Sequence, residues 1–156
     1  MKEFSELVDS NVFANKKVAV VENSYANATF MIEGLLKLMN LRELFSFYKD
    51  KAYYNHIEAK VETIFESEYV FADNVIIDDF YTAQMLFGIS VSTGVCIYRS
   101  NSFTYKYARN FDLLILVSPL ESGFSTVYDG VVRIVDRDRI YYEFKYKIDG
   151  HIGLLR

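Results

Sequence analysis

Hydrophobic and polar residues follow two different periods along this chain, and the two periods predict strands and helices in alternation. Short runs of consecutive apolar residues, rich in Val, Ile and Leu, are typical of strands that are buried on both faces of a sheet. Such runs predict strands at residues 16–21, 44–48, 74–77, 91–98 and 112–117.

The segments around these strands predict helices. Residues 1–15 form an N-terminal helical segment, residues 28–40 follow the first strand with an apolar face at helical spacing, and residues 81–87 form a helical turn. A helix over residues 53–66 is predicted because it has an apolar side and an acidic side, formed by Ile57, Val61, Ile64 and Phe65 and by Glu58, Glu62 and Glu66.

The C-terminal part alternates with a period of two instead. Residues 131–135 and 140–148 predict a terminal antiparallel β-hairpin, joined by a polar turn at residues 136–139. Its second arm places Tyr142, Phe144, Tyr146 and Ile148 on one face and Glu143, Lys145 and Lys147 on the other.

This order of elements predicts a single α/β domain over residues 1–156, with a mostly parallel sheet flanked by helices. Half of the residues are hydrophobic, which is sufficient for a core in a chain of 156 residues. No apolar run reaches the ~20 residues that span a bilayer, and the N-terminus lacks the pattern of a signal peptide. We therefore expect a cytoplasmic protein that has no membrane partner.

Charge is unevenly distributed along the chain, whose net charge is -4. Residues 43–79 contain nine acidic residues and three lysines, whereas residues 80–111 contain no acidic residue. This asymmetry predicts one acidic and one mildly basic surface, although solvated faces of ordinary elements explain it equally well.

A strand followed by a loop and a helix, at residues 18–36, has the position and spacing of a phosphate-binding P-loop but not its residues. The pattern G-x-x-x-x-G-K-[ST] needs glycines for close backbone approach, Lys for the phosphates and a hydroxyl for Mg²⁺. Here Glu22 and Asn27 occupy the glycine positions, Ala28 occupies the Lys position, and Thr29 alone is retained. Nucleotide hydrolysis is therefore not expected.

Three further segments have the order of nucleotide-binding motifs. Residues 74–79 resemble a Walker B strand that ends at Asp78 and Asp79, and residues 112–118 resemble a strand that ends in a polar sensor residue. Residues 128–134, which contain Asp129 and Gly130, resemble the A-D-G-V-I-x-L segment that begins the terminal hairpin of RecA-fold proteins. From residue 16 to residue 147 the chain resembles the KaiC/RadA branch of the RecA superfamily.

This resemblance implies a RecA-like sheet flanked by helices and assembly side by side with related subunits. The family includes members that have lost hydrolysis and keep the fold as an interaction surface. The degenerate loop is similar to that group, so the resemblance implies a non-catalytic interaction or regulatory subunit without a cofactor. Its expected partner is a RecA-family ATPase or a second copy of the chain.

The other chemically active residues give weaker signals. Adjacent Asp78 and Asp79 point to opposite faces of a strand, so one of them faces a site at most, and a solvated strand end is the default interpretation. Glu22 is a candidate to meet one of these carboxylates across neighbouring strands, as a raised-pKa pair or a cation site. No ligand spacing supports a metal site, and His56 and His151 lack zinc spacing.

Two single residues have a structural interpretation. Cys96 lies between apolar neighbours without a basic activator, which predicts a structural thiol. Ser118 precedes Pro119 outside any G-x-S-x-G context, so it gives no support for a serine hydrolase.

Residues 98–109 interleave cations with aromatic residues, as single-stranded nucleic-acid-binding segments do. The candidate contacts to nucleic acid or to a protein partner are Arg99, Phe103, Tyr105, Lys106 and Arg109. Two alternatives to the interaction subunit thus stay open. They are an accessory single-stranded nucleic-acid-binding factor in recombination or repair, and a residual Mg-nucleotide enzyme that uses Asp78 or Asp79.

The family reading also predicts an arrangement of strands. The strand at residues 16–21 is expected to be buried between the strands at residues 74–77 and 112–117.

Overall fold

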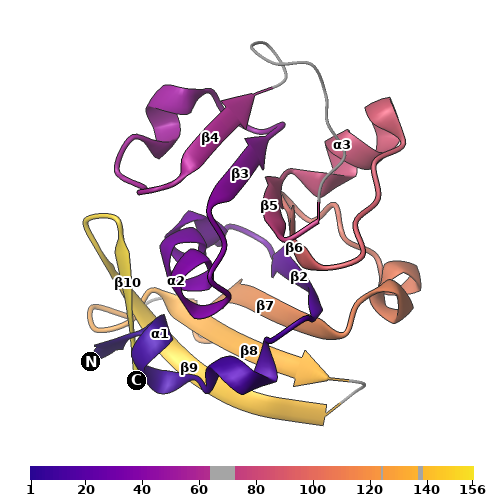
Figure 1. Cartoon of the computed structure of the whole chain (residues 1–156). Coiled ribbons are helices and arrows are strands. Elements are labelled where there is room, and N and C mark those ends of the chain that lie inside the picture. The colour runs from indigo at the N-terminus through magenta and orange to yellow at the C-terminus, as the bar shows by residue number, and fades with distance from the viewer. Residues whose placement is uncertain (64–72, 124, 137–138) are drawn as a thin grey trace.

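The computed structural model describes residues 1–63, 73–123, 125–136 and 139–156. Within these residues the strands form one mixed sheet in the order β1-β10-β9-β8-β7-β2-β6-β5-β3-β4 (Figure 1). The strands are β1 (Lys2–Glu3), β2 (Lys17–Glu22), β3 (Glu43–Ser46), β4 (Lys60–Thr63), β5 (Val75–Asp78), β6 (Gly94–Tyr98), β7 (Leu113–Pro119), β8 (Gly130–Asp136), β9 (Arg139–Asp149) and β10 (Ile152–Leu155). The α/β class and the mostly parallel sheet are confirmed.

The strands from β7 to β4 run parallel to one another, and β2 lies between β7 and β6. Strand β2 is buried and adjoins β7, as predicted, with Val20 opposite Ile115. Its other neighbour is β6, so the prediction that β5 flanks β2 is wrong. Both β5 and β6 are buried along their whole length, and burial alone therefore does not tell from the sequence which of them is more central.

The antiparallel part contains the predicted hairpin, in which β8 pairs with β9 and extends the sheet from β7. Tyr142, Phe144, Tyr146 and Ile148 face the core, as the alternation predicts. Strands β10 and β1 are additional, since Lys2 and Glu3 pair with Leu155 and Leu154. This pairing joins the two ends of the chain, and no local sequence pattern signals it.

The N-terminal helical segment is shorter than predicted. Helix α1 (Phe4–Leu7) is one turn long and is followed by the 3₁₀ helix η1 (Ser10–Val12). A capping box between Glu3 and Glu6 begins α1, and the strand pairing of residues 2–3 prevents an earlier start.

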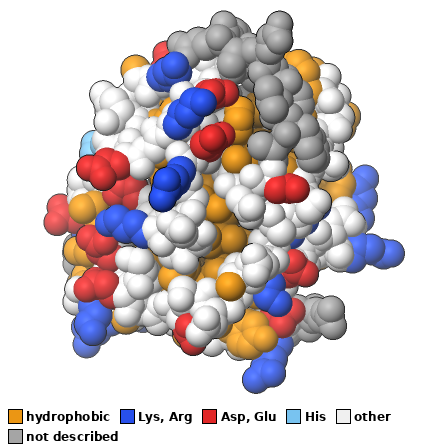
Figure 2. Space-filling model, viewed as in Figure 1, with side chains coloured by type: hydrophobic (Ala, Val, Ile, Leu, Met, Phe, Trp, Pro, Cys, Tyr) orange, Lys and Arg blue, Asp and Glu red, His pale blue; other side chains and the backbone are white. Residues whose placement is uncertain are grey.

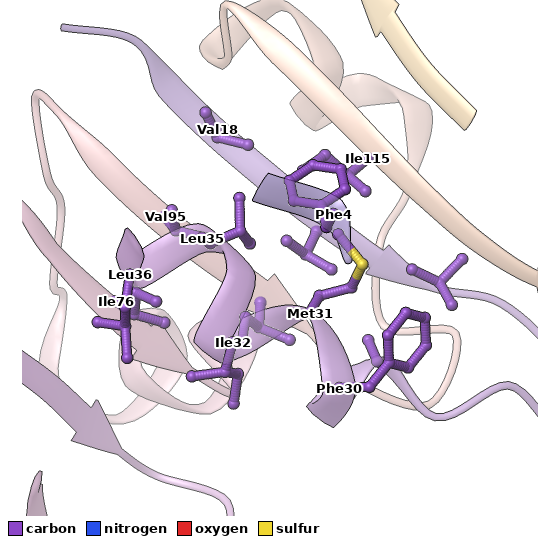
Figure 3. Close-up of a cluster of buried hydrophobic side chains, with 14 of the residues drawn as sticks. Phe4, Val18, Phe30, Met31, Ile32, Leu35, Leu36, Ile76, Val95 and Ile115 are labelled. Carbon is purple, nitrogen blue, oxygen red and sulfur yellow. The ribbon is translucent and has the colours of Figure 1, made fainter. Parts of the chain in front are cut away.

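Helix α2 (Met31–Leu38), preceded by the 3₁₀ helix η2 (Ala28–Phe30), covers one face of the sheet and confirms the helix predicted over residues 28–40. Its buried face includes Met31, Ile32 and Leu35, which lie against side chains from the central strands such as Ile76 and Ile115 (Figure 3). Each such side chain contributes about 1.5–3 kcal/mol when fully buried. This apolar layer holds α2 against the central strands.

The helix predicted over residues 53–66 is wrong within the described residues. Residues Lys51–Tyr54 form the 3₁₀ helix η3, and Lys60–Thr63 form β4, in which Val61 lies opposite Leu44. The β-branched Val61 and Thr63 favour a strand. The helix was predicted from a helical spacing of apolar residues, whereas residues 60–63 follow the period of two of a strand. Residues 64–66 of the predicted helix lie outside the described residues.

Helix α3 (Phe80–Phe87) confirms the helical turn predicted at residues 81–87. Together with the 3₁₀ helix η4 (Tyr105–Asn110) it lies on the opposite face of the sheet from α2, over a second apolar cluster that contains Val21, Cys96 and Tyr98. The parallel half is thus covered on both faces.

Charged side chains are unevenly placed on the face seen in Figure 2. Several acidic side chains lie along its left edge together with Lys and Arg side chains, and further Lys and Arg side chains project from its right edge. Hydrophobic side chains are visible between them.

Gly130, in the Asp-Gly pair that begins β8, has no room for a side chain, because a Cβ there would overlap the Ser118 carbonyl oxygen and the Tyr146 ring. We expect Gly130→Ala to lower the free energy of unfolding by about 3 kcal/mol through this overlap. Urea unfolding measures the loss. The control is Gly123→Ala, where the space is open but φ is +82°, and where about 1 kcal/mol is expected from backbone strain. Equal losses in the two variants would contradict the packing at Gly130.

Candidate functional site

Three neighbouring parallel strands end at one edge of the sheet, and their last residues form the candidate site. Glu22 is the last residue of β2, Asp78 is the last residue of β5, and Arg99 directly follows β6, which lies between them. Because the strands are parallel, their carboxyl ends meet at this edge. The sheet therefore brings two acids and one cation together from distant parts of the sequence.

The Arg99 guanidinium joins the two carboxylates. Its Nε donates to Asp78 Oδ1 and its Nη2 donates to Asp78 Oδ2, both at 2.7 Å, while Nη1 donates to Glu22 Oε2 at 2.8 Å. Arg99 is 3% exposed, Glu22 is 5% exposed and Asp78 is fully buried. This is a bidentate, charge-assisted arrangement that a lysine cannot reproduce.

The loop between β2 and α2 supplies further acceptors to the same guanidinium. Arg99 Nη1 also donates to Thr29 Oγ1 at 3.0 Å and to Asn27 Oδ1 at 3.2 Å. The guanidinium carbon lies 4.2 Å from the centre of the Tyr48 ring, in cation–π geometry. Arg99 is therefore enclosed by the loop, two strand ends and an aromatic ring.

The Glu22 carboxylate also holds the loop backbone. Its Oε2 accepts the Ala28 backbone N–H at 3.0 Å, and its Oε1 accepts the Ser100 backbone N–H at 3.1 Å. Backbone N–H groups at the start of a helical segment are the donors that bind phosphate in a working loop. In this protein a carboxylate of the chain accepts the Ala28 N–H.

Asp78 has a third partner on its other side. The Tyr54 hydroxyl donates to Asp78 Oδ2 at 2.6 Å and lies 2.9 Å from the Ser46 hydroxyl. Burial, and next the negative charge of Asp78, raise the pKa of Tyr54 above its ordinary value, so it remains a donor at neutral pH. Both Asp78 oxygens are thus satisfied by the protein.

The charges in the site stabilise one another. Burial alone lowers the pKa of Arg99, but hydrogen bonds and attraction from Asp78 and Glu22 outweigh it and hold the pKa above its ordinary value. The guanidinium is therefore a permanent cation between two acids. A buried pair of this kind is costly to disrupt, because removing one partner leaves an uncompensated charge.

The structure brings together most of the residues predicted from the degenerate motifs. Glu22, Asn27, Ala28, Thr29 and Asp78 all lie at the site, and Asp78 is not a solvated strand end, since it is fully buried. As predicted, only one of the two adjacent aspartates faces it.

Asp79 instead adopts a left-handed backbone conformation and caps α3, accepting from the Thr82 backbone N–H at 3.3 Å and from the Thr82 hydroxyl at 2.7 Å. Glu22 and Asp78 are joined by the Arg99 guanidinium, which binds both carboxylates. Among the described residues no group of three or more His, Cys, Asp or Glu side chains is placed to hold a metal ion.

The role assigned to Arg99 from the sequence is wrong, because a buried side chain cannot contact nucleic acid or a partner. The sequence pattern that indicates its position is a cation directly after a buried strand, β6, when the strands on both sides of it, β2 and β5, end in acidic residues. Phe103 is half-buried against Tyr98, while Tyr105, Lys106 and Arg109 are exposed on η4. Tyr54 and Ser46 were not predicted, since the helix expected over residues 53–66 hid the contact of Tyr54 with Asp78.

The remaining candidates lie away from this network. Cys96 is buried in β6, and burial raises the pKa of its thiol to about 12, in agreement with a structural thiol. His56 and His151, distant in sequence, stack with ring centres 4.0 Å apart. Burial, followed by the charge of His151, lowers the pKa of His56. Ser118 Oγ accepts from the Asn23 side-chain amide at 3.2 Å.

Comparison with models of known protein families and with curated proteins finds no match to this chain. In the part of the chain that the structure describes, no helix combines the length and the apolar character needed to cross a membrane. The site is therefore interpreted from its own geometry.

Replacing Arg99 tests the network. We expect Arg99→Ala to reduce the free energy of unfolding by about 3–5 kcal/mol, because it leaves Glu22 and Asp78 buried without their cation. Arg99→Lys should reduce the free energy of unfolding by a smaller amount, since an ammonium group keeps the charge but cannot bind Asp78 through two parallel hydrogen bonds. The matched control is Arg109→Ala on the surface, with a change within about 0.5 kcal/mol. If Arg99→Ala costs no more than this control, the ion pairs do not form as described.

Proposed function

We propose that this protein is a non-catalytic, RecA/KaiC-like interaction subunit whose nucleotide site is filled by its own side chains. It acts by binding another protein, not by turning over a nucleotide. The observation that carries the proposal is the buried Arg99 guanidinium, held by Asp78 and Glu22 beside the degenerate loop.

Each element of a phosphate site has an internal substitute here. The Glu22 carboxylate accepts the Ala28 backbone N–H in place of a phosphate oxygen, and Arg99 supplies the positive charge. Asp78, at the Walker B-like position, binds the guanidinium in place of Mg²⁺, and Thr29 contacts Arg99 and Tyr53. A nucleotide would have to displace a buried ion pair, at a cost of about 3 kcal/mol or more, which weakens binding at least ~100-fold.

The fold supports the RecA-like part of the proposal. The segments that resemble the Walker A strand, the Walker B strand, the sensor strand and the terminal hairpin all lie in one sheet, as β2, β5, β7 and β8–β9. The first two of these strands direct their last residues to the same edge, where the degenerate loop lies. The motif segments therefore share one sheet in which β6 separates the Walker B-like strand β5 from β2.

The surface supports a role in binding. Tyr25, at the tip of the degenerate loop, is 99% exposed on a turn held by two hydrogen bonds, from Ser24 N to Asn101 Oδ1 and from Asn23 N to Val117 O. Met85 and Leu86 are exposed on α3. Exposed aromatic side chains on rigid supports are typical anchors of protein interfaces.

Nucleic-acid binding is a second candidate, favoured by the exposure of Tyr105, Lys106 and Arg109 on η4. With Arg99 buried, this segment offers two cations for phosphate contact. The phosphate-driven part of the affinity is correspondingly small. A protein partner is therefore the favoured ligand.

Nucleotide binding tests the filled site. We expect Mg-ATP and Mg-GTP to produce neither hydrolysis nor a thermal shift, because the N–H, cation and carboxylate groups are already paired. A ligand with a Kd of ~10 µM would, at ~1 mM, stabilise the folded state by about 2.7 kcal/mol and would be seen readily. Stabilisation of this size, abolished by Thr29→Ala, would refute the proposal.

Single-stranded DNA binding separates the two candidates. If the η4 segment contacts nucleic acid, affinity should fall steeply with salt and Tyr105→Ala should cost about 1–3 kcal/mol. We expect no measurable binding of single-stranded DNA at physiological salt.

Partner retention tests the favoured candidate. We expect tagged protein to retain a protein partner from nuclease-treated native lysate. Tyr25→Ala should reduce this retention, while Tyr128→Ala, a control tyrosine, should not. Submicromolar DNA binding that Lys106→Glu and Arg109→Glu abolish would favour the second candidate.

A further inference from the structure

The turn between β9 and β10 lies beside the connection between η3 and β4 (Figure 1). His151 on the turn stacks on His56 of the connection, with ring centres 4.0 Å apart and an angle of 17° between the ring planes. The turn belongs to the antiparallel half of the sheet, whereas the connection leads into β4, the last strand of the parallel half. The two imidazoles therefore join the two halves of the protein at a point outside the sheet.

The surroundings of His56 suit a neutral imidazole. Within the described residues its Nδ1 atom is buried and has no hydrogen-bond partner. A neutral imidazole can carry its proton on Nε2 and leave Nδ1 without one, whereas an imidazolium donates from both nitrogens. Protonation of His56 would therefore place a donor without an acceptor in a buried position, which costs free energy.

The charged and titratable groups around the pair do not remove this preference. They are Glu33 and Lys37 from α2, Tyr53 from η3, Glu58 from the segment of His56, and His151 from the turn, which the exposed Asp149 precedes. Burial, and next the charge of His151, lower the pKa of His56, and the attraction of Glu33 does not offset them. His56 is therefore mainly neutral at pH 7.

We propose that the His56–His151 stack is an acid-sensitive contact, which holds the β9–β10 turn against the η3–β4 connection near neutral pH and releases it when both imidazoles are protonated. Two cations at this ring separation repel each other, and His56 has no acceptor for its second N–H. The proposal is independent of the filled nucleotide site.

The contact stabilises the protein at neutral pH and not at acidic pH. Its contribution is complete above the ordinary histidine pKa of about 6.5. It is lost as the pH falls through the lower pKa of His56 in the folded protein, because the released turn binds protons that the stacked turn excludes.

Release changes the pocket that the two segments share. This pocket has a volume of about 210 Å³, and Phe30 and Ile148 are among the residues that line it. Movement of the turn widens it. The turn that carries Tyr25 stays in place, since Asn101 and Val117 hold it.

Nuclear magnetic resonance of the full-length protein tests the release directly. We expect nuclear Overhauser effects between the His56 and His151 rings at about pH 7.5, and their loss at about pH 5. His56 should titrate at a lower pH than an ordinary histidine, and His151→Gln, which removes the neighbouring charge, should shift this titration upward. The Gly150 amide resonance should move in the same transition, whereas the Tyr25 amide resonance should not.

Urea unfolding supplies a second measurement with a matched control. The chain contains two histidines, so the double variant His56→Gln with His151→Gln has none. Between about pH 7.5 and about pH 5, the unfolding midpoint of the unaltered protein should fall further than that of the double variant. The two single substitutions should be non-additive at the higher pH, where the rings are in contact, and additive at the lower pH.

Several results would overturn this proposal. These are ring contacts that persist at the lower pH, a His56 titration at or above the ordinary pKa, or an equal fall of the midpoint in the double variant. One-to-one binding of Zn²⁺ at micromolar concentration, lost in either single variant, would also overturn it, by showing that the two imidazoles hold a metal ion. Nucleotide binding is measured separately and refutes only the filled site.

Discussion

The ion pairs of Arg99 with Asp78 and Glu22 are the interaction on which this edge of the protein depends. Three charged groups are removed from water there, and each is stable only while the other two remain in place. They join the ends of β2, β5 and β6 to the loop that precedes α2. A buried ion-pair network need not make a protein more stable than a well-packed apolar cluster of the same volume would. It does, however, hold the three strand ends in one arrangement. The loop conformation follows from the Glu22 contact with the Ala28 N–H.

Much of the fold could be predicted from the sequence because its central strands are apolar throughout. The segments that became β2, β5, β6 and β7 have no competing helical pattern, and α2 has a single apolar face. The helix predicted over residues 53–66 was wrong because Val61 and Glu62 fit a helical period and a strand period equally well over so short a segment. The pairing of β1 with β10, and the position of β6 beside β2, depend on contacts distant in sequence, which no local pattern contains.

The site was predictable in its acids and not in its cation. Glu22 was identified from its place in the P-loop pattern and Asp78 from the Walker B-like strand that it ends. Parallel strands direct both residues to one edge of the sheet. Arg99 was assigned to the surface because the residues after it, from Phe103 to Arg109, form an interleaved cationic and aromatic segment. Its actual position follows from charge balance. Two buried acids at the ends of strands on either side of β6 require a cation, and Arg99 is the first residue after β6.

The filled site has a consequence for how the proposed interaction subunit would work. In a nucleotide-dependent protein, loops around the phosphates change conformation when the ligand binds or is hydrolysed. In the proposed site Glu22 and Arg99 would supply the contacts of a ligand permanently. The turn that carries Tyr25 is held by Asn101 and Val117. The surface beside the degenerate loop is therefore preorganised, so a partner pays little to order it. On this reasoning the protein would present a constant binding surface, and regulation would have to come from the partner.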